Sequence, residues 1–117
     1  MAHYLRLGKT AEFPVGSLRA FQVAGREVAV SNVEGSFYAF GNECTHARAF
    51  LTQGEIRDCR IVCTWHWASF DMATGRVIMG PAGLPLPVYG IRTEGDELQI
   101  EWPEVLPENA VVAVERY

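Results

Sequence analysis

The sequence has no apolar run long enough to cross a bilayer, and its first residues contain no apolar stretch of the length that a signal peptide needs. It is also poor in basic charge, with 10 Lys and Arg residues against 14 Asp and Glu residues and a net charge of −4. Nucleic-acid binding requires a basic face, so this balance argues against it. We therefore expect a cytoplasmic protein that binds neither nucleic acid nor a membrane.

Cysteine is scarce as well, with three in the chain. Three cysteines cannot all be paired, and Cys44 and Cys63 each lie close to a histidine in the sequence. The remaining Cys59 is predicted to be a free thiol, which suits a reducing compartment.

Helical periodicity is missing too: no segment of normal helix length repeats its apolar residues every three to four positions. Short apolar runs instead alternate with turn residues from Tyr4 to Phe40. Ala24-Gly25-Arg26 and Glu34-Gly35-Ser36 are typical of hairpin turns, because glycine tolerates positive φ. With 49% hydrophobic and 21% charged residues, the 117-residue chain is predicted to form one globular all-β domain.

The middle of the chain continues the strand pattern. Ile56 to Cys63 is predicted to be a strand or hairpin, and a period of two would place Cys59, Ile61 and Cys63 on one face. Cys59 is thus expected to be buried or half-buried, with a structural role. Three prolines in Gly80 to Pro87 fix φ and remove backbone donors, so this segment is predicted to be a shaped loop.

The last part of the chain contains a predicted hairpin and a tail. Val88 to Arg92 and Leu98 to Trp102 are expected to form a closing hairpin. Within the tail, Ala110 to Val114 is rich in valine, which favours a strand. This strand would either add to a sheet edge or meet another subunit, and the sequence does not choose between the two.

Two short pairs carry the chemistry: Cys44-Thr45-His46 and Cys63-Thr64-Trp65-His66, with 16 residues between them. Each pair offers one thiolate and one imidazole, a set that suits either zinc or an iron–sulfur centre in which imidazoles replace two thiolates. Zinc-finger pairs usually contain one kind of ligand each. Each pair in this chain is mixed, so the pattern departs from that of a zinc finger.

These pairs resemble the Rieske [2Fe-2S] family, whose motif is Cys-x-His, about 16 residues, then Cys-x-x-His. Phe70-Asp71, Thr74-Gly75 and the Gly80-Pro81 loop extend the resemblance, which covers about residues 4 to 102. It implies a small antiparallel β-sandwich with a cluster-binding subdomain of two ligand loops. A Rieske domain over residues 1–102 and an extension over residues 103–117 are therefore expected.

The resemblance also assigns the ligands of one [2Fe-2S] cluster. Cys44 and Cys63 would hold the buried iron, and His46 and His66 would hold the outer iron at the protein surface. A third, proline-containing loop covers the cluster in the family. No other cofactor is expected.

Four positions near the ligands bear on the reduction potential, which spans about −150 to +300 mV in Rieske centres. High-potential members have a disulfide where this chain has Ala49 and Trp65. They also have serine and tyrosine hydroxyls where this chain has Ala68 and Phe70. The resemblance thus implies a potential at the low end of the range, with Ser69 as the one nearby hydroxyl.

The resemblance implies a soluble ferredoxin that passes single electrons from a flavin-dependent reductase to a terminal oxygenase, in particular an aromatic-ring-hydroxylating dioxygenase, and a low potential suits that role. His3, interpreted as a surface residue, is the only histidine outside the ligand pairs, so a second iron site of two His and a carboxylate cannot be assembled. The chain is expected to be a carrier and not an enzyme. A Rieske-like small subunit of a nitrite-reductase-type enzyme and a structural zinc domain remain as alternatives.

Apolar residues of the loops are candidates for docking on these partners, although the two tryptophans among them would equally pack over the cluster. Arg48 would either steer acidic partners or be solvated. The apolar candidates are Ala47, Phe50, Trp65, Trp67, Pro81 and Leu84.

Overall fold

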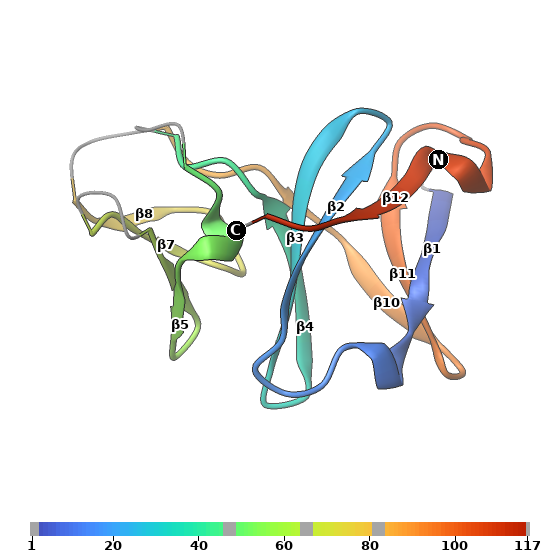
Figure 1. Cartoon of the computed structure of the whole chain (residues 1–117), viewed down its shortest axis with the longest axis horizontal. Helices are drawn as coiled ribbons and strands as arrows, with labels where there is room; N and C mark the ends of the chain where they lie inside the picture. Colours follow the sequence, from blue (N-terminus) through green and yellow to red (C-terminus); the bar gives the residue numbers. More distant parts are fainter. Residues whose placement is uncertain (1–2, 46–48, 64–66, 81–83, 117) are drawn as a thin grey trace.

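The computed structural model describes residues 3–45, 49–63, 67–80 and 84–116. Its regular structure consists of β-strands and short 3₁₀-helices, and none of the described residues is α-helical. The all-β prediction is confirmed. The strands form three antiparallel sheets in a molecule that measures 37 × 27 × 27 Å (Figure 1). No helix among the described residues is long and apolar enough to span a membrane.

Two sheets form what we call the base, residues 3–41 and 88–116. The first has the order β1-β11-β10 and the second the order β12-β2-β3-β4-β9. Their bounds are β1 His3–Lys9, β2 Leu18–Val23, β3 Arg26–Val33, β4 Ser36–Gly41, β9 Val88–Tyr89, β10 Ile91–Glu94, β11 Glu97–Trp102 and β12 Val111–Val114. The 3₁₀-helices η1 Thr10–Glu12 and η3 Glu108–Ala110 lie in their connections.

The predicted hairpin turns of the base are confirmed. Ala24 and Gly25 have φ values of 50° and 81°, and Glu34 and Gly35 have values of 52° and 94°. Two consecutive residues with positive φ form the tight turn whose twist matches that of the flanking strands. The β2-β3 and β3-β4 hairpins are thereby set in register.

The core of the base lies between its two sheets. Alternate residues of β11 are buried, as expected for a strand with one face on a core. The rings of Phe13 and Phe21 stack with centroids 5.9 Å apart. The buried members of this core are Leu5, Leu7, Phe13, Phe21, Val23, Val28, Val30, Ala39, Leu98, Ile100 and Trp102.

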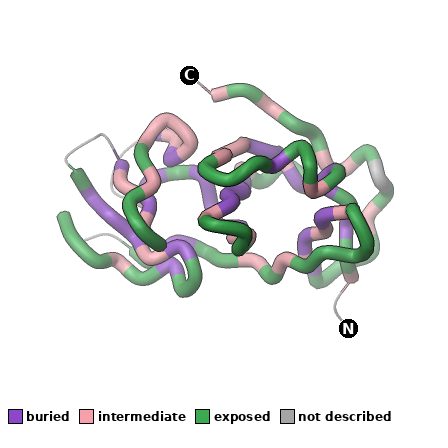
Figure 2. The backbone as a smooth tube through the Cα atoms, turned by 90° about the horizontal axis from the view of Figure 1, so that it is seen from below, coloured by how far each residue is buried: buried purple, intermediate pink, exposed green. Residues whose placement is uncertain are grey.

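The third sheet belongs to what we call the tip region, residues 42–87. Its order is β5-β6-β7-β8, with β5 Glu55–Arg57, β6 Arg60–Val62, β7 Ser69–Asp71 and β8 Val77–Met79, and the 3₁₀-helix η2 Leu51–Gln53 precedes it. A second core lies here, with Leu51, Ile61 and Phe70 among its largest members, and Phe40 of β4 contributes to it from the base. Figure 2 shows buried segments both in the base and in the tip region.

The closing hairpin differs from the prediction in one respect. Ile91–Glu94 pairs with β11 as expected, but Val88–Tyr89 pairs with β4. Gly90 lies between the two segments, and a side chain there would meet the Glu101 carboxylate at 2.3 Å. The predicted strand is therefore divided between the two base sheets.

The tail contributes an edge strand to the base. Val111–Val114 pairs with β2 in antiparallel register, from Val111 opposite Val23 to Val114 opposite Ala20. Leu106 and Val111 pack against the base core. The division of the chain at residue 102 remains a prediction.

Candidate metal centre

The first ligand loop leaves β4 and returns at η2. The start and the end of this loop are held together by Asn42, which is fully buried. The Asn42 backbone carbonyl accepts a hydrogen bond from Leu51 N at 2.7 Å, and its side-chain Oδ1 accepts one from Thr52 N at 2.9 Å. Inside the loop, Cys44 N donates to Ala49 O at 2.9 Å. These bonds fold the loop back on itself and turn Cys44 toward the tip core.

The second ligand loop connects β6 to β7. Cys63 follows directly after β6, and its backbone N–H donates to Ala68 O at 2.7 Å. The Cys63 side chain is 1% exposed and that of Cys44 is 5% exposed, and both belong to the tip core. Two cysteines from loops far apart in the sequence thus meet in one buried cluster of residues.

A third loop, the proline-containing one, contacts the first. The Thr45 hydroxyl donates to Leu84 O at 2.6 Å, and Gly41 N, at the end of β4, donates to Pro87 O at 2.9 Å. Gly80, where this loop begins, lies so close to the second ligand loop that a Cβ there would be 2.6 Å from Ala68 Cα. All three loops therefore converge at one end of the molecule.

The arrangement fits the cysteine half of a two-iron site. Both thiols are withdrawn from water, as the inner ligands of a Rieske centre should be. The predicted ligands His46 and His66 lie outside the described residues. Among the residues that the structure does describe, no group of three or more His, Cys, Asp and Glu side chains is placed to hold a metal ion.

The positions expected to tune the potential are buried next to the ligands. Ala49, Ala68 and Phe70 are 7%, 1% and 1% exposed, and none carries a hydroxyl. Ser69 is also buried. Trp65 lies outside the described residues.

Apolar side chains are exposed around these loops. Trp67 and Leu84, two of the predicted docking residues, are 62% and 74% exposed, whereas Phe50 is half-buried. Ala47, Trp65, Pro81 and Arg48 lie outside the described residues. Sequence reasoning missed Met79, which is 63% exposed although it belongs to β8. The signal for it was present, since Met79 follows the turn at Thr74-Gly75 on the strand that leads into the proline loop.

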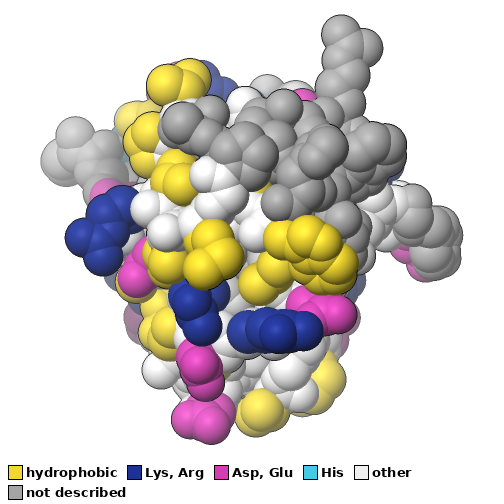
Figure 3. All heavy atoms as spheres, turned by 90° about the vertical axis from the view of Figure 1, so that its left-hand side faces the viewer, with side chains coloured by type: hydrophobic (Ala, Val, Ile, Leu, Met, Phe, Trp, Pro, Cys, Tyr) yellow, Lys and Arg dark blue, Asp and Glu magenta, His cyan; other side chains and the backbone are white. Residues whose placement is uncertain are grey.

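Hydrophobic side chains on this end of the molecule lie beside both basic and acidic groups (Figure 3). Between residues 43 and 86 the sequence has four acidic residues, Glu43, Glu55, Asp58 and Asp71, and four arginines, Arg48, Arg57, Arg60 and Arg76. The tip region therefore carries no net formal charge, and the −4 of the chain comes from the base.

The sequence also led to expectations for His3 and Cys59, which lie outside the proposed ligand set. His3 begins β1 opposite Trp102, in the base, and is half-buried. Cys59 was expected in the core or half-buried, and this prediction is wrong because its side chain is exposed. Asp58, with φ of 55°, and Cys59 form the turn between β5 and β6, so the alternation assumed across them is interrupted. The Cys59 thiol lies 3.5 Å from the Tyr38 hydroxyl, and this hydrogen bond raises the pKa of Tyr38.

Comparison with known proteins places these observations in a family. The Rieske [2Fe-2S] domain matches residues 3–90. The ferredoxin component of the naphthalene 1,2-dioxygenase system of Pseudomonas aeruginosa is 34% identical over 90 residues, which are 77% of this chain and 86% of that protein.

Solved structures agree. The ferredoxin of carbazole 1,9a-dioxygenase from Nocardioides aromaticivorans IC177 is 32% identical, with a TM-score of 0.79 over 83% of this chain and 95% of that one. A chain in a complex of reduced oxygenase and oxidized ferredoxin in carbazole 1,9a-dioxygenase is 27% identical, with a TM-score of 0.80 over 89% of this chain and 97% of that one. The chain therefore belongs to the Rieske [2Fe-2S] domain family, whose domain carries one [2Fe-2S] cluster, and within that family it is a Rieske-type ferredoxin.

Proposed function

We propose that Cys44, His46, Cys63 and His66 ligate the cluster and that the protein carries single electrons from a flavin-dependent reductase to a terminal oxygenase. The observation that carries this proposal is the burial of Cys44 and Cys63 together, at the end where three loops converge. The similar ferredoxins serve dioxygenase systems that act on naphthalene and carbazole. An aromatic-ring-hydroxylating dioxygenase is accordingly the proposed recipient.

The bound cluster supplies a site that accepts and releases one electron at a time. The protein determines how the electron reaches it. Cys44 and Cys63 lie inside the tip core, so the inner side of the site is shielded from water. Trp67 and Leu84 lie on the outside, where they offer apolar area for a short-lived contact with each partner. The proposed histidine ligands follow the cysteines on the same loops and would form the edge through which the electron passes.

The proposed compartment is the cytoplasm. Cys59 is exposed, and its thiol would be open to oxidation outside a reducing environment. The net charge of −4 gives no support to nucleic acid as a partner.

Electron transfer through a reconstituted system tests this function. The reduced protein is mixed with the terminal oxygenase of an aromatic-ring dioxygenase in a stopped-flow instrument. Oxidation of the ferredoxin is followed by the change in its visible absorption. Trp67→Ala and Leu84→Ala are each expected to slow transfer by about tenfold, because central apolar residues dominate binding at small interfaces. Val15→Ala is the matched control, since Val15 is 67% exposed but lies in the base.

The control and the spectrum together decide the outcome. Val15→Ala should leave the rate unchanged, and all three variants should keep the absorption of the parent protein. Equal rates for parent, Trp67→Ala and Leu84→Ala would move the docking surface away from the tip region. Failure of the reduced parent protein to pass electrons to any aromatic-ring dioxygenase would refute the carrier function.

A further inference from the structure

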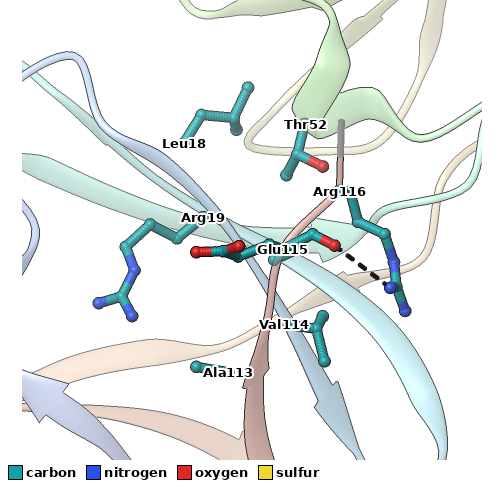
Figure 4. Close-up of a pocket in the computed structure, with 8 residues that line it drawn as sticks. Leu18, Arg19, Thr52, Ala113, Val114, Glu115 and Arg116 are labelled. Carbon is teal, nitrogen blue, oxygen red and sulfur yellow. Dashed lines mark hydrogen bonds between the residues drawn. The ribbon is translucent and has the colours of Figure 1, made fainter.

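The last described residue of the tail, Arg116, returns to the tip region although it lies beyond residues 3–90, the part that the family model matches. Pairing of β12 with β2 directs the end of the chain toward η2, as Figure 1 shows. Arg116 and Thr52 both line a groove of about 560 Å³ beside β12, in which Arg116 points away from Arg19 (Figure 4). The side chain of Arg116 is 23% exposed.

The Arg116 guanidinium contacts three groups. Nη2 donates to Glu27 Oε1 in a close ion pair, and Nη1 donates to the Glu115 backbone carbonyl at 3.4 Å. Its Cζ lies 4.8 Å from the centre of the Phe50 ring, within the range of a cation–π contact. One planar group thus joins the sheet of the base to the far end of the first ligand loop.

Glu27, on β3, connects Arg116 to Asn42, which lies at the near end of the same loop. Its Oε2 accepts from Asn42 Nδ2 at 3.3 Å, its backbone carbonyl accepts from Asn42 N at 3.2 Å, and Oε1 also accepts from Gln22 Nε2 at 3.1 Å. Burial alone would raise the pKa of Glu27, but hydrogen bonds from Arg116, Gln22 and Asn42 outweigh it and lower the pKa. The carboxylate is therefore charged at neutral pH and able to hold both partners.

Asn42 and Phe50 mark the two ends of the loop that carries Cys44. Asn42 closes the loop through Leu51 and Thr52, and Phe50 forms a bridge with Glu43. Because Arg116 holds Asn42 through Glu27 and covers Phe50 directly, it acts on both ends at once. A guanidinium is suited to this, since it can pair in its plane and stack on its face.

We propose that Arg116 is a positioning residue, which clamps the two ends of the first ligand loop and so holds Cys44 in place for the cluster. The part of the proposal that concerns the cluster rests on the ligand assignment made under the proposed function. The tail thereby serves the site from outside the region that the family model matches. The competing possibility is that the ion pair only fastens the tail to the sheet.

Local hydrogen exchange separates these possibilities. The amides to measure are those of Leu51 and Thr52, which donate to Asn42. Arg116→Gln should speed their exchange by about tenfold, the ratio that corresponds to losing one charge-assisted hydrogen bond. Amides in the centre of β3 should not change. Arg92→Gln is the matched control, because Arg92 also lies over a ring, 3.5 Å from the centre of Tyr4, but on β10.

Spectroscopy of the cluster-loaded protein gives the second readout. Arg116→Gln should lose its visible absorption about tenfold faster in the presence of an iron chelator, again by the loss of one such bond. It should also shift the g values of the reduced state. Arg116→Lys should fall between the parent and Arg116→Gln, because lysine can pair with Glu27 but cannot stack flat on Phe50. Glu27→Gln and Arg116→Gln combined should cost less than the sum of the two single changes.

Each outcome decides a different claim. If Arg116→Gln leaves the Leu51 and Thr52 amides as protected as in the parent, the clamp is refuted. If those amides respond but chelator resistance and g values do not, Arg116 holds the loop without positioning Cys44, and that part of the proposal falls. A colourless parent protein whose Leu51 and Thr52 amides still respond would refute the ligand assignment and uphold the clamp.

Discussion

The strands of the base are up to eight residues long, whereas each strand of the tip sheet has three. In the base, β2, β3 and β4 pair over most of their length, and their inward faces fill one core. The tip region has little ladder pairing, and loop-to-loop hydrogen bonds such as Cys44 N to Ala49 O and Cys63 N to Ala68 O take its place. The base is thus stabilised by regular structure, and the tip region by specific contacts among its loops.

Close backbone approaches show the same difference. A Cβ at Gly54 or Gly75 in the tip region would lie 2.1 Å from the carbonyl oxygen of Val62 or Leu86, respectively. In the base, a Cβ at the turn residue Gly25 would meet nothing within 4 Å. The tip loops are therefore packed backbone on backbone, which leaves them little freedom to adjust. This contrast indicates that the tip region depends on close contacts among its loops more than the base does.

Removal of the cluster should produce the largest difference in stability between the tip region and the base. Chelation of iron from the reduced protein is expected to speed amide exchange in β5–β8 on the order of a hundredfold, since bound metal stabilises only the folded site. The β2-β3-β4 sheet should keep its protection. Hydrogen exchange of the loaded and stripped protein measures both regions at once, and equal loss of protection in the two would show that they form one unit.

Two glycines with nearly the same φ test the backbone packing. Gly75 has φ of +79° and Gly25 has φ of +81°, so replacement by alanine strains both backbones equally. Gly25→Ala should cost about 1 kcal/mol, from the left-handed conformation alone. Gly75→Ala should cost about 3 kcal/mol or more, because the Leu86 carbonyl must move as well. Denaturant unfolding gives both values, and similar losses would mean that the tip loops yield easily.

A hydroxyl at position 70 should act on the cluster, and one in the base should not. Phe70→Tyr would place a hydroxyl where high-potential members of the family have one. A hydrogen bond from this hydroxyl to the site would be stronger in the reduced state, which carries more negative charge, and would therefore raise the potential. We expect a rise of about 60 mV, the one-electron equivalent of a tenfold change in equilibrium constant. Phe21→Tyr, in the base core, is the control and should leave the midpoint of a redox titration unchanged. A rise in both variants would point to a general effect of core polarity.

The smallest effect concerns Glu27, where base and tip meet. Its pKa in the folded protein is below the ordinary value of 4.5, so its contribution to stability is complete above that value and is lost as the pH falls through the folded pKa. Glu27→Gln should therefore be less stable than the parent at pH 7, by up to about 1 kcal/mol. Thermal unfolding of the two proteins should converge below pH 4.5. If the difference in stability between the two proteins stayed constant at acid pH, the charge of Glu27 would not be its cause.

The sequence allowed more of the base to be predicted than of the tip region, for a physical reason. Hairpins such as the one at Ala24 and Gly25 are determined by local turn chemistry, which the sequence displays directly. Cys59 was misplaced because alternation was carried across a turn, and a single residue with positive φ, Asp58, is enough to interrupt it. The division between β9 and β10 likewise depends on how Gly90 approaches Glu101, a contact between distant segments.

In the candidate site, too, local patterns in the sequence were predictive and contacts between distant segments were not. The spacing of the ligand pairs led to the Rieske family, which the comparisons confirm. Spacing says nothing about Arg116, because its contacts with Glu27 and Phe50 join three parts of the chain that are far apart in sequence. The assignment of His46 and His66 as ligands remains a prediction.

The most direct measurement is an EPR spectrum of the purified protein after reduction with dithionite, with the visible absorption recorded before and after. Two imidazole ligands on one iron predict a red-brown protein whose reduced state gives a rhombic signal with an average g lower than that of a [2Fe-2S] cluster with four cysteine ligands. The His66→Cys variant, reduced and measured in the same way, should lose that signal shape if His66 is a ligand. A parent protein that binds no iron, or one whose reduced signal has the average g of a four-cysteine cluster, would contradict the account.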